Sequence, residues 1–164
     1  MLTDTLCTRC GLCCDGTLLG DVELTGPAEA ARLELLGLDV DTDDADADVL
    51  PLPCAALQGT CCSIYTRRPG SCRAFECRLL QNAQRGAVTV DAALATIAHA
   101  HAQVARVTAL LARMESRAGR VPLAERVADA MAVAGAGSRA VRSTAELDAA
   151  MAALALTIRT TFLD

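Results

Sequence analysis

The chain has 164 residues and a formal net charge of −5, with no tryptophan and a single tyrosine. Nucleic-acid-binding proteins need a basic surface and aromatic side chains for stacking, so this composition argues against that class. The length allows one domain with a core, or a small core with an appended helical part. The apolar residues are mostly alanine and leucine, a composition that favours helices.

The start of the chain and the length of its apolar runs indicate where in the cell the protein is expected. Residues 1–6 lack the basic stretch and the apolar stretch of a secretory signal, so we expect no such signal. No run approaches the ~18 uninterrupted apolar residues of a membrane span, so we expect no membrane partner. These observations predict a cytoplasmic protein, because the reducing cytosol keeps thiols available for metal.

The first group of cysteines is the densest feature of the sequence. Cys7, Cys10 and Cys13 repeat a Cys-x-x-Cys step, and a turn at that spacing lets thiolates converge on one ion. Gly11 lies inside this loop, where a residue with positive φ costs least. Cys14 directly follows Cys13, and adjacent side chains diverge. The two therefore serve different metals, or one of them only supports a ligand.

The segment between the two cysteine groups predicts a short strand, a helix and a loop. Loose apolar alternation within residues 16–24 indicates a strand or extended segment. A helix is expected over residues 27–36, because Pro27 suits a first helical turn and Gly37 suits an end. Residues 39–48 are an acidic run. The calcium-loop pattern fails where its glycine and final glutamate should stand, so we predict a solvated loop without calcium.

The next cysteines are predicted to lie on a hairpin. Prolines make residues 49–54 extended, and a turn is expected at residues 58–60. Together these signals predict a hairpin that presents Cys54 and Cys62 on neighbouring strands.

A helix is predicted to follow from Pro69 to Leu80. Cys72 and Cys77 are five residues apart, which is about 140° around an ideal helix. They would need an irregular turn to share one ion, and otherwise they serve two.

Apolar residues at helical spacing predict three further helices, over residues 91–117, 122–134 and 143–159. Asp91 is the expected N-cap of the first, which Gly119 would stop. The sequence Ser143-Thr144-Ala145-Glu146 is the expected capping box of the third.

The predicted fold is therefore α+β and mostly helical. Residues 1–85 form a small cysteine-rich metal-binding domain with short irregular strands. Residues 86–164 form a helical region that packs on this domain or on a partner chain. His99 and His101 are two residues apart on a helix and cannot easily grip one ion together, so packed or surface roles are expected for both.

The number of thiols bears on their chemistry. Nine cysteines exceed the needs of one tetrahedral ion, and an odd number in a reducing compartment argues against disulfides. Two mononuclear sites, a bridged dinuclear site, or one iron–sulfur cluster with spare cysteines all fit this number. Thiolate suits both zinc and iron–sulfur clusters, so the spacing does not choose between them.

The cysteines and their neighbours form an ordered pattern over about residues 5–80. It reads Cys7-x-x-Cys10-Gly11-x-Cys13-Cys14, then Pro53-Cys54-x-x-Leu57, then Cys62-x-Ile64-Tyr65-x-x-Arg68-Pro69-x-x-Cys72-Arg73-x-Phe75-x-Cys77. This pattern resembles the YkgJ-type cysteine-cluster family, the zinc- or iron-chelating CxxCxxCC domain.

The resemblance implies bound zinc or iron. A similar cysteine pattern in flagellin lysine-N-methylases, where an iron–sulfur cluster is implicated, keeps a cluster open as an alternative. Cys61 precedes the matching Cys62 and is an extra cysteine that could replace it as a ligand. Carried over by position, the implied metal ligands are Cys7, Cys10, Cys13, Cys14, Cys54, Cys62, Cys72 and Cys77.

Four other residues of the pattern carry separate predictions. Arg68 and Arg73 either donate to thiolate sulfurs or form salt bridges with a nearby carboxylate such as Glu76. Tyr65 and Phe75 are predicted to be core aromatics.

Three functions compete at this point. The favoured one is a cytosolic binding module whose cysteines hold zinc or iron, because no catalytic constellation accompanies the thiols. The alternative is an enzyme with a redox or radical iron–sulfur cluster. In the third, metal only closes a small fold and the helical half binds a protein partner or a second copy.

Overall fold

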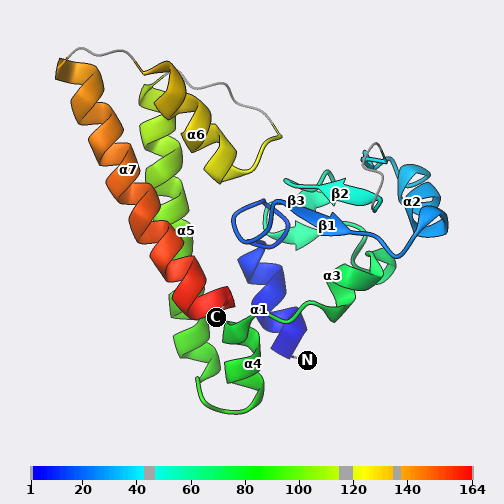
Figure 1. The fold of residues 1–164 in the computed structure, drawn as a ribbon. Coiled ribbons are helices and arrows are strands. Elements are labelled where there is room, and N and C mark those ends of the chain that lie inside the picture. The colour runs from blue at the N-terminus through cyan, green and yellow to red at the C-terminus, as the bar shows by residue number, and fades with distance from the viewer. Residues whose placement is uncertain (1, 43–46, 115–119, 135–137, 164) are drawn as a thin grey trace.

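The structure, a computed structural model, describes residues 2–42, 47–114, 120–134 and 138–163. Within these residues helices predominate, and two small antiparallel sheets accompany them (Figure 1). The predicted class, α+β and mostly helical, is confirmed. Two predicted details lie outside the described residues: the middle of the acidic run and the stop at Gly119. Of the described helices, none is long and apolar enough to cross a membrane.

The N-terminal part is built from a helix, a two-stranded sheet and a second helix. Val22 stands opposite Leu50 in the antiparallel sheet, and both side chains are buried. The expected extended segments and the helix that starts at Pro27 are confirmed, whereas a helix over the first cysteines was not predicted. The elements are α1 (Leu2–Cys10), β1 (Asp21–Glu23), α2 (Pro27–Glu34) and β2 (Val49–Pro51).

The predicted hairpin is present, but it carries only one of the two expected cysteines. Strands β3 (Leu57–Gln58) and β4 (Cys61–Cys62) pair across the expected turn. Cys54 lies before β3, and its N–H donates to the carbonyl of Cys14 at 2.8 Å. The placement of Cys54 on a strand was therefore wrong. Pro53 cannot donate to a strand ladder, and the Cys54 N–H bonds to the first cysteine loop instead.

The predicted helix from Pro69 to Leu80 is broken into two. A 3₁₀ turn, η1 (Tyr65–Arg67), is followed by α3 (Gly70–Ala74) and then by α4 (Arg78–Gln84). Phe75 and Cys77 have extended backbone conformations between the two helices. Cys72 and Cys77 consequently lie on opposite sides of a break.

The C-terminal part contains the three expected helices, with shifted starts. They are α5 (Val90–Arg113), α6 (Leu123–Val133) and α7 (Ser138–Ile158), and a π-helical turn, η2 (Arg159–Leu163), ends the described chain. Thr89, not Asp91, caps α5, because its side chain accepts the N–H of Ala92. The predicted capping box is also wrong: α7 begins before it, and the Thr144 hydroxyl bonds to the Val141 carbonyl inside the helix.

Two apolar cores lie on either side of the cysteine loops. The larger joins α1 and α4 to α5, α6, α7 and η2, and its fully buried members include Leu12, Leu111 and Phe162. The smaller lies under α2 and the first sheet, around Leu33 and Leu50. Helices α5 and α7 pack side by side along their length, and α1 packs against α5 (Figure 1). The helical half thus supports the N-terminal cysteines directly, while a domain boundary at residue 85 stays a prediction.

Candidate metal centre

One cavity of about 500 Å³ gathers cysteines from separate parts of the chain. They come from α1, the loop after it, the segment before β3, strand β4, α3 and the start of α4. Cys61 does not line this cavity; it is exposed, and its thiol lies 3.3 Å from the carbonyl of Thr8. The cysteines that line the cavity are the eight predicted as metal ligands: Cys7, Cys10, Cys13, Cys14, Cys54, Cys62, Cys72 and Cys77.

The end of α1 positions the first cysteines. Cys7 and Cys10 are three residues apart on the last turn of this helix, so they share one face. Gly11 then has a φ of +67°, and a Cβ there would lie 3.0 Å from the Cα of Thr60. The Thr60 hydroxyl donates to the carbonyl of Thr8 at 2.7 Å. A glycine is therefore needed where α1 docks on the turn of the hairpin.

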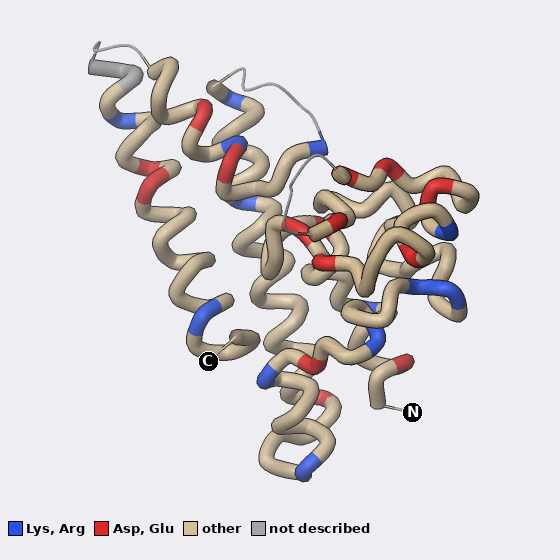
Figure 2. The backbone as a smooth tube through the Cα atoms, turned by 45° about the vertical axis from the view of Figure 1, so that its right-hand side comes forward, with Lys and Arg blue, Asp and Glu red and all other residues tan. Residues whose placement is uncertain are grey.

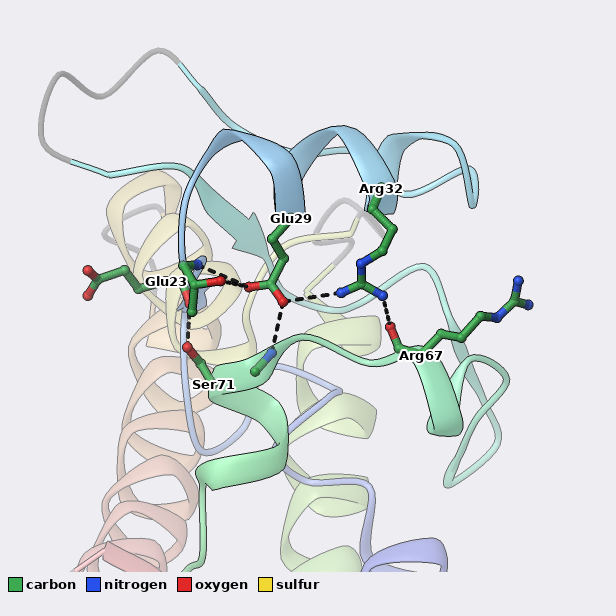
Figure 3. Close-up of polar contacts among 7 residues, drawn as sticks. Glu23, Glu29, Arg32, Arg67 and Ser71 are labelled. Atoms are coloured by element: carbon green, nitrogen blue, oxygen red, sulfur yellow. Dashed lines mark hydrogen bonds and ion pairs between the residues drawn. The ribbon is translucent and has the colours of Figure 1, made fainter.

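A carboxylate positions α3, which carries Cys72. Glu29 on α2 accepts the N–H of Gly70, the first residue of α3, at 3.0 Å, and it accepts the N–H and hydroxyl of Thr25 at 3.0 Å each (Figure 3). Arg32 donates both to Glu29 at 3.1 Å and to the carbonyl of Arg67. Burial raises the pKa of Glu29, but these donors outweigh it and hold the pKa below its usual value.

Four thiols form a first set: Cys7, Cys10, Cys13 and Cys77. Burial is the main cause that raises the pKa of Cys10 to about 12, and the charges of Cys77 and Cys7 raise it further. Burial also raises the pKa of Cys13, and here the neighbouring thiols with the largest effect are Cys10 and Cys77. Thiols that act on one another in this way lie close together in the cavity.

The other four thiols, Cys14, Cys54, Cys62 and Cys72, form a second set. Burial raises the pKa of Cys14 to about 12, and the charges of Cys62, Cys54 and Cys72 add to it. Burial raises the pKa of Cys72 to about 11, again with contributions from Cys54 and Cys62. Cys14 also acts on Cys13, so the two sets meet at this adjacent pair.

The two sets can offer thiolate to a soft or borderline metal ion. No group of three or more His, Cys, Asp or Glu side chains in the described ranges already has the arrangement of a metal site. The thiols of a set would therefore have to close around an ion and release their protons as it binds. Sulfur-only donor sets of four suit zinc and iron, so the donor chemistry fits either metal.

Arginine and aromatic side chains complete the cavity wall. The guanidinium carbon of Arg68 lies 4.0 Å from the centroid of the Tyr65 ring, and the Tyr65 hydroxyl donates to Asp4 at 3.3 Å. Tyr65 and Phe75 line the cavity and belong to neither buried core, so their prediction as core aromatics was wrong. The fully buried aromatic is Phe162, which the sequence analysis did not single out, although the apolar spacing of the last helix continues toward it.

Both histidines lie outside the cavity wall, as predicted. His99 is exposed on α5, and His101 is partly buried.

Comparison with known proteins agrees with this geometry. A family model, CxxCxxCC, described as "Putative zinc- or iron-chelating domain", matches residues 6–93, just over half of the chain. The chain belongs to this family. The CxxCxxCC match takes in all eight cysteines of the cavity and ends at the start of α5, so most of the helical half lies beyond it. A search of curated proteins and a search of solved structures found no match.

Proposed function

We propose that this CxxCxxCC protein is a binding module that holds two zinc or iron ions, one in each set of four thiols. The observation that carries the proposal is that eight cysteines line one cavity, and the mutual effects on their pKa values favour a division into two sets of four. Four thiolates satisfy one tetrahedral ion, and a second set of the same size satisfies another. Metal binding at each set would tie segments far apart in the sequence to one another.

The first ion would be held by the end of α1, the following loop and the start of α4, through Cys7, Cys10, Cys13 and Cys77. The second would be held by the same loop, the segment before β3, strand β4 and α3, through Cys14, Cys54, Cys62 and Cys72. The break between α3 and α4 supports this division, because it separates Cys72 from Cys77.

One observation favours a second candidate. Both sets open into the same cavity and meet at Cys13 and Cys14. In such a shared cavity, four of the thiols could bind one iron–sulfur cluster. The other four would then support the cluster or remain unbound. That cluster would supply redox chemistry, and a reducing compartment such as the cytosol would suit either form.

The test is to purify the full chain without oxygen and without added metal, and then to measure zinc, iron, copper and acid-labile sulfide with an absorption spectrum. About two zinc or iron ions per chain without sulfide would support the binding module. Matched iron and sulfide with broad absorption near ~400 nm would support the cluster. A chain that stays metal-free on titration with zinc and with ferrous iron, and on anaerobic incubation with iron and sulfide together, would contradict both.

A further inference from the structure

Arg68 occupies a special place in the cavity wall. It stacks on Tyr65, and Pro69, which follows it, is fully buried. The guanidinium therefore lies on the face of an aromatic ring, next to a buried stretch of backbone in the sequence. Arg73, the other basic residue of the wall, is exposed on α3, where water weakens its electrostatic effect.

The charge of Arg68 reaches both thiol sets. Burial is the largest cause of the raised pKa of Cys7 in the first set and of Cys72 in the second, and the positive charge of Arg68 opposes it at both. Cys7 lies on α1 and Cys72 on α3, and Arg68 lines the same cavity as both of these thiols.

Arg68 also has an unused donor. Its Nε is buried and has no hydrogen-bond partner among the described residues. A buried donor without an acceptor is unfavourable, and a water, an ion or a ligand in the cavity would supply the missing acceptor. Thiolates become strong acceptors when metal replaces their protons, so the loaded cavity would supply that partner.

The cavity wall carries more acidic than basic side chains. Four carboxylate residues line it beside the two arginines: Asp4, Asp21, Glu23 and Glu76. Acidic and basic positions are interspersed along the chain, and the described residues bring no further arginine to this wall (Figure 2). Four thiolates around one divalent ion leave two negative charges uncompensated, and two such sites that meet at Cys13 and Cys14 would repel each other.

We propose that Arg68 compensates the charge of both thiol sets and thereby lets the two sets hold metal at the same time. The inference rests on the proposed function. Arg68 is a supporting residue that donates to thiolate sulfur and reduces the repulsion between the two loaded sites. Without it, the first ion binds somewhat more weakly, and the second ion is weakened further because its site also meets the uncompensated charge of the first site.

The experiment is a stepwise zinc titration of the metal-free full chain without oxygen, in competition with a chromophoric chelator. Wild type should bind two ions. Arg68→Gln should weaken both binding steps, the second by about 10- to 100-fold, as removal of a group that hydrogen-bonds a metal ligand usually does, and the first by less. Raising the salt concentration should narrow this difference, because ions screen the repulsion. Arg67→Gln removes the same charge from an exposed side chain outside the cavity wall and should behave as wild type.

Arg68→Lys keeps the positive charge but changes the packing. Its affinity for the second zinc ion should be closer to that of wild type than the affinity of Arg68→Gln is. Circular dichroism of the metal-free variants checks that both fold, and the lysine variant carries the test if the glutamine variant does not. Two unchanged affinities in Arg68→Gln, equal losses in the glutamine and lysine variants, or an equal loss in Arg67→Gln would each overturn the role of Arg68. A wild-type chain that binds fewer than two ions would instead contradict the two-ion proposal itself.

Discussion

Cys13 and Cys14 show how a single step along the chain divides the cavity. Adjacent side chains diverge, and the thiols that raise the pKa of Cys13 most are Cys10 and Cys77, whereas those that raise the pKa of Cys14 most belong to the second cysteine group. The divergence could be predicted from the sequence. The identity of the thiols that gather around each could not, because they come from segments separated by a hairpin and a broken helix.

Serine substitutions test this division. Cys10→Ser and Cys72→Ser should each lose about one of the two bound ions, and the double variant should lose both. The reason is that a hydroxyl is a poor substitute for thiolate as a ligand to zinc. Each loss should also lower the melting temperature, because metal binding is coupled to folding. Elemental analysis and thermal unfolding measure the two effects.

The matched control is Cys61→Ser, because Cys61 is exposed and lies outside the cavity wall. Full metal content and an unchanged melting temperature are expected for it. If Cys10→Ser and Cys72→Ser behave in the same way as this control, the ligand assignment is wrong.

The raised thiol pKa values predict how pH affects the metal-free protein. The unfolded chain releases thiol protons near pH 9.0, whereas Cys10 and Cys14 keep theirs in the folded state until about 12. Between these values the unfolded state binds fewer protons, so the free energy of unfolding falls as pH rises, by up to about 1.4 kcal/mol per pH unit for each thiol. The contribution is complete below pH 9 and is lost as pH approaches 12.

Urea unfolding with a reductant and a chelator, at pH steps from 7 to about 10.5, measures this slope. The zinc-loaded protein, measured without the chelator, is the control, and its stability should not fall between pH 9 and 10.5 because its thiols have already lost their protons. Equal slopes with and without zinc would contradict the assignment of the buried thiols as the source.

At the scale of elements, α3 depends on a neighbour for its position. It is short, and its first N–H is accepted by Glu29 of α2, while the Ser71 hydroxyl donates to the carbonyl of Glu23 on β1 (Figure 3). Isolated helices of this length are unstable in water, so such contacts decide where Cys72 lies.

Glu29→Gln tests this dependence. The side chain of Glu29 is 10% exposed, and the amide would lose the charge that its donors require. We expect the free energy of unfolding to fall by about 1–3 kcal/mol, and the ion held with Cys72 to bind more weakly than the ion held with Cys10. Urea unfolding and zinc titration measure the two effects. Glu34→Gln, an exposed change on the same helix, is the control, and equal effects in the two variants would contradict the role of Glu29.

The elements that could be predicted are those with a local signal. Pro27 and Pro122 mark the starts of α2 and α6, because proline suits a first helical turn or the residue before it. The break between α3 and α4 has no such signal, since Phe75 and Cys77 are ordinary residues in an extended conformation. The surroundings of these residues decide the break, and with it the separation of Cys72 from Cys77.

At the scale of the whole molecule, the helical half packs against the elements that carry the cavity thiols. Phe162 belongs to the larger core and also lines the cavity, and its segment η2 packs against α4, which begins directly after Cys77. The end of the described chain therefore supports a cysteine almost ninety positions earlier in the sequence. Contacts over such a separation leave no local pattern, which explains why Phe162 was missed while Tyr65 and Phe75 were assigned to the core.

Phe162→Ala tests whether the helical half contributes to metal binding. The side chain is 1% exposed, so its removal should lower the free energy of unfolding of the metal-free protein by about 3–5 kcal/mol. Loss of support for α4 should also weaken the ion held with Cys77, while the ion held with Cys72 should be less affected because α3 rests on α2. Urea unfolding and stepwise zinc titration separate these effects. Leu156→Ala changes a side chain of α7 that is 54% exposed and is the control. If Phe162→Ala is destabilised but binds both ions as this control does, the helical half stabilises the fold without supporting the metal site.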